Sequence, residues 1–197
     1  MAEGKMDARA ARTAASLERA IVALSSEKPA ASLTVSEVAR EAGVNRVTFY
    51  RHAESPEKLL GSILRRDLDR IRADDRVRRD DPAFEATDEP YVQVVLGEVA
   101  AHVLAYEPIY RRAFADPVGG AERAVLADHF TESARLHFRN NVRTAHPELS
   151  DSIDEETTAR FIGHGLSGAV GAWLESGAGD RDRFVATTTA LFPAWWS

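Results

Sequence analysis

The chain has 197 residues with a formal net charge of −6, and 44% of them are hydrophobic, which suffices for a packed core. It contains no cysteine, which excludes disulfides, thiolate zinc sites and a cysteine nucleophile. No apolar run approaches the ~18 residues of a membrane helix, and the N-terminus lacks a secretory signal pattern, so we expect a cytoplasmic protein.

Helical periodicity runs through the chain and no clear alternating strand is visible, so we predict an all-α fold. The first helix is expected over residues 7–26 and is stopped by Lys28-Pro29. Its apolar face, at the spacing of one helix turn, consists of Leu17, Ile21 and Leu24.

A second helix is predicted from Val35 to near Ala42. Thr34 and Glu37 fit a capping box, in which each side chain bonds the backbone amide of the other residue. Gly43 follows, and a glycine adopts the positive φ of a tight turn at little cost.

A third, short helix begins after Asn45, a good N-cap, and ends near Arg51. Together with the second helix it has helix-turn-helix form. Its inner side carries Phe49, and its other side is crowded with polar groups. These groups are Asn45, Arg46, Thr48, Tyr50, Arg51 and His52.

A fourth, longer helix starts at Ser55-Pro56, because proline suits the first helical position. Beyond Ile71 it becomes highly charged (RADDRVRRDD), which indicates a solvated face. A loop is expected over residues 80–90. Five helices are predicted after it, over residues 91–106, 109–115, 121–141, 153–175 and 182–192, with a second capping box formed by Ser152 and Glu155.

The charge distribution allows a nucleic-acid partner despite the acidic total. Residues 1–60 hold nine Lys/Arg and eight Asp/Glu, a net charge of +1, whereas the remainder holds sixteen against twenty-three, a net charge of −7. A helix fits the B-DNA major groove, ~12 Å wide, where arginine can read guanine, asparagine can read adenine and a threonine methyl can contact thymine. The third helix is therefore a candidate recognition helix.

The segment LTVSEVAREAGVNRVTFYRHAESPEKLL, residues 33–60, resembles the DNA-binding domain of the tetracycline-repressor (TetR) family of transcriptional regulators. The resemblance implies a helix-turn-helix DNA-binding domain at residues 1–56 and a larger helical effector-binding and dimerisation domain at 57–197. It further implies a homodimer on a partly palindromic double-stranded DNA operator, with repression relieved by a small-molecule effector.

The resemblance also assigns roles to residues. Those that would face bases are Asn45, Arg46, Val47, Thr48 and Arg51. Those that would mainly hold phosphates are Thr34, Ser36, Tyr50 and His52. Pro56 stands where the family often has a basic residue, and Lys58 would partly replace that phosphate contact. Ala53 departs from the aromatic residue that is common after the histidine.

Three of these residues have competing structural explanations. Asn45 could serve only as the N-cap of the third helix. Tyr50 could be partly buried beside Phe49, and His52 could cap the end of the helix.

The glycine-rich segment from Gly163 contains a G-x-G-x-x-G, but it lies inside a helical pattern, so we predict close helix packing and no dinucleotide site. One face carries Gly165, Gly168 and Ala172, and a neighbouring face carries Gly163, Ser167 and Gly171. Because the family dimerises through its last two helices, these residues and Trp195 are predicted at a dimer interface. Packing within one subunit is the alternative for any single glycine, and the terminal tryptophans could instead dock on the flank of the domain.

An effector pocket is predicted from aromatic and titratable residues, namely His102, Tyr106, Tyr110, His137 and Phe161. Aromatic residues at helical spacing can equally be core. No metalloprotease, hydrolase or P-loop motif occurs, so we expect no enzyme, no cofactor and no metal site. The alternative function is an α-helical small-molecule-binding or interaction protein with a non-functional helix-turn-helix.

Overall fold

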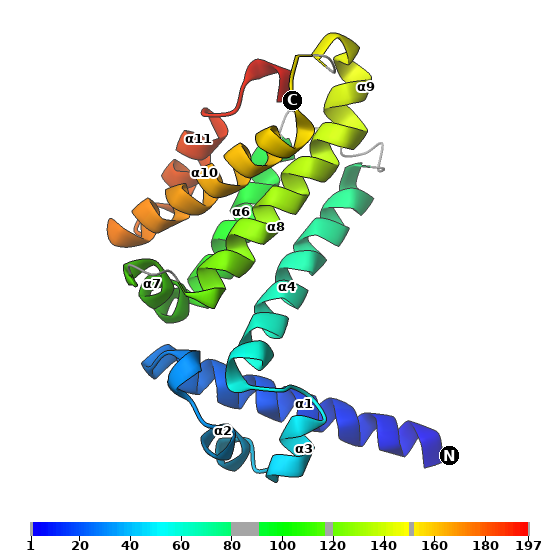
Figure 1. Ribbon diagram of the computed structural model, residues 1–197, viewed down its shortest axis with the longest axis vertical. Coiled ribbons are helices and arrows are strands. Elements are labelled where there is room, and N and C mark those ends of the chain that lie inside the picture. The colour runs from blue at the N-terminus through cyan, green and yellow to red at the C-terminus, as the bar shows by residue number, and fades with distance from the viewer. Residues whose placement is uncertain (1, 80–90, 117–119, 150–151, 197) are drawn as a thin grey trace. The chain divides into compact units, whose positions relative to one another are not determined.

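The computed structural model describes residues 2–79, 91–116, 120–149 and 152–196, and every regular element in these ranges is helical (Figure 1). The predicted all-α fold is therefore confirmed for the described chain. Two compact units are present, Met1–Leu64 and Arg65–Ser197, and their division falls inside helix α4, Pro56–Arg79.

The first unit consists of α1 (Ala2–Glu27), the 3-10 turn η1 (Ala30–Ser32), α2 (Val35–Glu41), α3 (Arg46–Tyr50) and the start of α4. Helix α2 packs against both α1 and α3. The core of this unit is made of side chains that are almost fully buried, namely Leu17, Ile21, Val38, Phe49 and Leu60.

The local signals read from the sequence of this unit are confirmed. Thr34 and Glu37 form the capping box, with the Glu37 amide 3.2 Å from Thr34 Oγ1 and the Thr34 amide 2.8 Å from Glu37 Oε2. Gly43 has φ +66°, and the next amide, of Val44, donates to the Ala39 carbonyl at 2.9 Å. These bonds fix the turn that sets α3 against α2.

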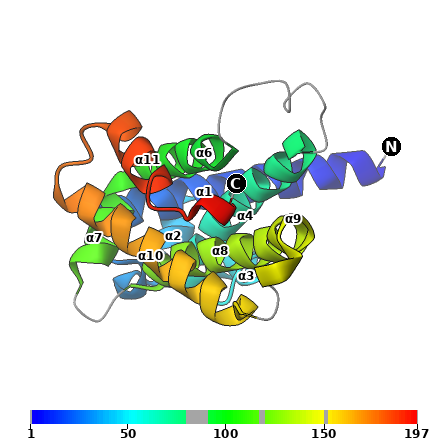
Figure 2. The same ribbon diagram turned by 90° about the horizontal axis from the view of Figure 1, so that it is seen from above.

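The second unit contains the rest of α4 and a bundle of further helices (Figure 2). These are α6 (Tyr91–Ala105), α7 (Glu107–Ala115), α8 (Ala121–His137), the π-helical turn η2 (Phe138–Val142), α9 (Arg143–Ala145), η3 (Pro147–Leu149), α10 (Glu155–Glu175), α11 (Arg181–Thr189) and η4 (Ala194–Trp196). Helix α10 packs along α8, and α11 packs along α6.

Several predicted boundaries in this unit were wrong. Helix α7 begins at Glu107, because Pro108 fits within its first turn and does not interrupt it. Asp154, not Ser152, caps α10, and its Oδ1 accepts from the Thr157 amide at 2.8 Å. The α-helix predicted over 121–141 becomes π-helical after His137, and α11 ends at Thr189. The predicted loop at 80–90 lies outside the described residues.

The C-terminal tryptophans pack on the flank of this unit. Trp196 is 4% exposed and belongs to a cluster with Phe138 and Val142. Its carbonyl oxygen lies 2.7 Å from Nε2 of His137, and Trp195 meets the Phe138 ring edge-on at 6.3 Å. The chain end is thus held against η2 and α8.

Candidate nucleic-acid interface and ligand cavity

Helix α3 presents a polar face that is held outward by one buried residue. Phe49 is fully buried, whereas Arg46 and Arg51 are exposed. Within the described chain, no hydrogen bond or ion pair engages the guanidinium of either arginine. Two donors with five N–H groups each are therefore available to an external acceptor.

The flanks of this face are exposed as well. Val47 is 72% exposed and Tyr50 57% exposed, and Ser36, His52 and Lys58 are also exposed. Tyr50 touches the Phe49 ring edge-on at 5.9 Å, but more than half of its surface remains accessible. Thr48 is half-buried.

Two predicted contact residues already serve the local fold. The Asn45 side-chain oxygen accepts from the Thr48 amide at 2.8 Å, so Asn45 is the N-cap of α3. The Thr34 hydroxyl lies 2.7 Å from Glu37 Oε2 within the capping box. Lys28 Nζ, 2.6 Å from Glu37 Oε1, and then Thr34 lower the pKa of Glu37 to about 2. The Glu37 carboxylate therefore stays ionised and paired with Lys28 in the first turn of α2.

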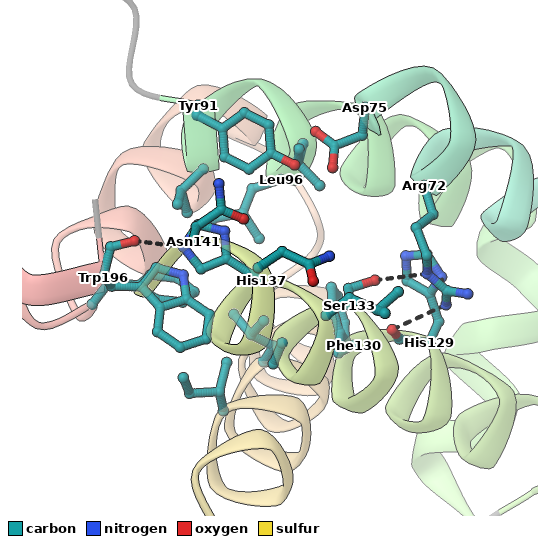
Figure 3. Close-up of a pocket in the computed structure, with 18 of the residues that line it drawn as sticks. Arg72, Asp75, Tyr91, Leu96, His129, Phe130, Ser133, His137, Asn141 and Trp196 are labelled. Atoms are coloured by element: carbon teal, nitrogen blue, oxygen red, sulfur yellow. Dashed lines mark hydrogen bonds between the residues drawn. The ribbon is translucent and has the colours of Figure 1, made fainter. Parts of the chain in front are cut away.

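The second unit contains a half-open cavity of about 720 Å³ (Figure 3). Side chains of α4, α6, α8, η2, α10 and the C-terminal segment line it. They are Asp69, Arg72, Ala73, Asp75, Tyr91, Val92, Val95, Leu96, His129, Phe130, Ser133, Ala134, Leu136, His137, Asn140, Asn141, Ile162, Leu166, Phe192 and Trp196. The volume falls in the range of sites for small organic ligands.

Arg72 ties the α4 wall of the cavity to α8. Its Nε donates to Ser133 Oγ at 3.1 Å, and its Nη2 lies 2.9 Å from His129 Nδ1 and 3.3 Å from the His129 carbonyl oxygen. Nη1 pairs with Asp69 at 3.1 Å. Because a guanidinium only donates, His129 Nδ1 accepts, and a neutral His129 ring carries its proton on Nε2.

The ring of His129 is uncharged at neutral pH. Burial, followed by the nearby charge of Arg72, lowers its pKa to about 3. The cation at this end of the cavity is therefore Arg72 and not the histidine.

Of the five residues predicted to line a pocket, His137 lines the cavity. His102 and Tyr110 are buried together, with His102 Nε2 2.9 Å from Tyr110 Oη. Tyr106 donates to Asp67 Oδ2 at 2.7 Å. Burial lowers the pKa of His102 to about 4 against the opposing effect of Asp67. These three form a polar core network and do not line the cavity.

Phe161 also lies away from the cavity, because its side chain is 81% exposed on α10. Sequence reasoning missed Arg72, Ser133 and Asp75. Arg72 and Asp75 belong to the charged run of α4 that the sequence analysis interpreted as a solvated face. Only their spacing of about one helical turn could have indicated that both side chains line the same cavity.

The two small-residue faces of α10 differ in the structure. A β-carbon at Gly163 would lie 2.6 Å from the Thr131 backbone nitrogen, and one at Gly171 would lie 2.7 Å from the Phe114 ring. Ser167, between them, is 3% exposed. This face packs within the subunit, against α8 and α7, as the alternative interpretation held.

The other face of α10 is open. Nothing lies within 4 Å of a β-carbon built at Gly165 or Gly168. Ala172 is exposed, and Phe161 continues the face toward the start of the helix. A partner helix could therefore approach this side closely.

The fold and the exposed α3 face define an all-α protein with a helix-turn-helix of the DNA-binding type. Residues 19–63 match a family model described as bacterial regulatory proteins, tetR family. The match covers the helix-turn-helix part of the chain, which is therefore similar to the DNA-binding domain of this family. None of the described helices combines the length and apolar character that crossing a membrane requires.

Solved structures share the fold over nearly the whole chain. The fatty acid degradation regulator FadR from Bacillus halodurans is 17% identical with a TM-score of 0.67, over 91% of this chain and 93% of that one. The dihydroxyacetone kinase operon activator DhaS is 13% identical with a TM-score of 0.58, over the same shares. A comparison with curated protein sequences gives no match.

Proposed function

We propose that the protein is a cytoplasmic, ligand-responsive repressor that binds a partly palindromic operator as a homodimer and leaves it when a small molecule occupies the cavity. The main support is the α3 face, on which Arg46 and Arg51 are exposed while Phe49 anchors the helix. Because this face is already exposed, α3 can enter a major groove without unfolding any part of the protein.

In this proposal Arg46, Val47, Thr48 and Arg51 face bases. The exposed side chains around them, Ser36, Tyr50, His52 and Lys58, hold phosphates together with the backbone near Thr34. Asn45 acts chiefly as a cap, because bidentate reading of adenine would compete for the oxygen that bonds the Thr48 amide.

The dimer would form through the open face of α10, which carries Phe161, Gly165, Gly168 and Ala172. Leu191, just after α11, is 75% exposed and would add apolar surface. Trp195 is left out of this face because it is partly buried and packs on Phe138. A two-fold dimer would place its two α3 helices in major grooves ~34–36 Å apart for adjacent half-sites.

Helix α4 would transmit the effect of ligand binding to the helix-turn-helix. This helix supplies one cavity wall through Arg72 and runs without interruption back to Pro56 beside the helix-turn-helix. A ligand that binds better to a conformation with another α4 position would shift the population away from the DNA-binding state.

The test is DNA binding by wild-type protein and Arg46→Ala, on an operator selected from random duplexes and footprinted at several salt concentrations. Arg46→Ala should weaken specific binding by roughly 1–3 kcal/mol and leave the melting temperature unchanged. Arg70→Ala is the matched control, since Arg70 is 65% exposed in the second unit.

Equal operator affinity in wild type and Arg46→Ala would remove Arg46 from the interface. A protein that selects no sequence at all would fit the alternative, a small-molecule-binding protein with an inactive helix-turn-helix. A reporter gene downstream of the selected operator separates repression from activation.

A further inference from the structure

We infer that each operator half-site carries a thymine whose C5-methyl group packs against Val47, with guanine bases read by the arginines beside it. This inference rests on the proposed function, because it names the base that α3 would select. It is drawn from the exposure and the spacing of the side chains on that helix.

Val47 is an exposed apolar side chain on the same face of α3 as two exposed arginines. It is 72% exposed, while Phe49 supplies the buried contact of this short helix. At 3.6 residues per turn, positions 46, 47, 50 and 51 fall within an arc of about 140° that leaves out Phe49. Val47 therefore stands on the face that would meet DNA.

Neither helix formation nor core packing accounts for a valine at this position. A β-branched side chain loses rotamer freedom in a helix, and Val47 buries little of its surface in the subunit. A single exposed valine elsewhere on the surface would carry no meaning. Here it follows Arg46 directly and precedes Arg51 by about one helical turn, so it has to fit whatever the two arginines bind.

The chemistry of the major groove leaves one partner for this side chain. Guanine presents two acceptors to an arginine there, and the thymine C5-methyl is the apolar group that the groove offers. The edges of the other bases are polar, and covering them with a valine would remove water without replacing its hydrogen bonds. Two arginines that flank a valine thus match thymine with guanine nearby.

The neighbouring side chains are less suited to read the methyl group. Thr48 is half-buried, and its amide donates to the Asn45 side-chain oxygen at 2.8 Å at the start of the helix. Tyr50 is 57% exposed, and its ring meets the Phe49 ring edge-on. Val47 is the most exposed of the large apolar side chains on this helix.

The helix geometry also sets the distance between the bases. Val47 and Arg51 are four residues apart, about 6 Å along a helix axis, and successive base pairs are ~3.4 Å apart. If α3 runs along the groove, the guanine read by Arg51 lies about two base pairs from the thymine. Arg46, adjacent in the sequence, reads a neighbouring base pair.

The experiment removes only the methyl group. An operator is selected from random duplexes with the full-length protein, and each thymine of one half-site is replaced in turn by deoxyuridine, which keeps every hydrogen-bonding group of the base. Affinities are measured by fluorescence anisotropy at one salt concentration. We expect one position where deoxyuridine weakens binding about fourfold, the equivalent of about 0.8 kcal/mol for one buried methyl group, with guanine within about two base pairs.

Variants assign the effect to a side chain. Val47→Ala should reduce the fourfold difference between thymine and deoxyuridine to less than about twofold, whereas Val47→Ile should keep it. Thr48→Ser is the matched control, because it removes the methyl group of the neighbouring residue and should leave the difference at about fourfold. Circular dichroism verifies folding, and the melting temperature of Val47→Ala should equal that of wild type because Val47 is exposed.

The outcomes separate this inference from the proposed function. A selected operator without a deoxyuridine-sensitive thymine overturns the inference and leaves the proposed DNA binding standing. The same holds for a sensitivity that is unchanged in Val47→Ala or lost in Thr48→Ser. A protein that selects no sequence overturns both.

Discussion

The contact of Gly163 with α8 gives a stability prediction that also decides which face of α10 belongs to the subunit core. In Gly163→Ala, the new β-carbon would lie 2.6 Å from the backbone nitrogen and 2.7 Å from Cα of Thr131. Backbone atoms cannot rotate aside, so α8 and α10 must move apart.

The expected size follows from two opposing effects. Overpacking a core by a methyl group costs roughly 1–3 kcal/mol, while replacing a helical glycine by alanine returns about 1 kcal/mol of helix propensity. The net loss is therefore about 0–2 kcal/mol, and we expect the upper end because the added β-carbon meets backbone atoms. This lowers the Tm by up to roughly 8 °C for a chain of this size.

Thermal and urea unfolding, followed by circular dichroism at one protein concentration, measure this change. Gly97→Ala is the control, because Gly97 is also inside a helix and nothing lies within 4 Å of its added β-carbon. It should be as stable as wild type or more stable by up to about 1 kcal/mol. Finding Gly163→Ala no less stable than wild type would refute the close approach of the two helices.

Two further predictions concern the histidine core and the open α10 face. Because the folded-state pKa of His129, about 3, lies below the unfolded value, protonation of the unfolded chain should reduce stability as pH falls from about 6.5, by up to about 1.4 kcal/mol per pH unit. His129→Asn should show a shallower loss of urea midpoint between pH 7 and 5, and an unchanged slope would contradict the buried neutral ring. Phe161→Asp should convert dimers to monomers in analytical ultracentrifugation without lowering helix content, because Phe161 is 81% exposed in the subunit; an intact dimer would place the interface elsewhere.

The helix-turn-helix was predictable because its determinants act over a few residues. The capping box at Thr34 and Glu37, the positive φ of Gly43 and the Asn45 cap each involve groups within four positions of one another. Local side-chain chemistry therefore specifies the turn and the outward face of α3 before any distant contact is known.

The cavity could not be predicted in the same way, because its polar contacts join residues far apart in the chain. In the sequence, Arg72 is one charge in a run that is expected to be solvated. It lines the cavity because it bonds Ser133 of α8, which lies 61 positions further along the chain. His102 and Tyr106 look like pocket residues until Asp67 and Tyr110 are seen to satisfy them. Likewise, periodicity places Gly163 and Gly165 on different faces without revealing which face is covered.

Under the proposed function, the position of charge in the cavity would link ligand chemistry to DNA binding. Every charged residue of the described lining belongs to α4, so a charged ligand head would meet its charged partners on that helix. The apolar body of the ligand would contact walls that do not continue into the first unit. Contacts of the apolar body can therefore add to binding affinity without affecting α4. The head, in contrast, can change the bonds by which Arg72 holds α4 to α8. On this argument, ligands that share a chain and differ in head charge should differ more in operator release than in occupancy.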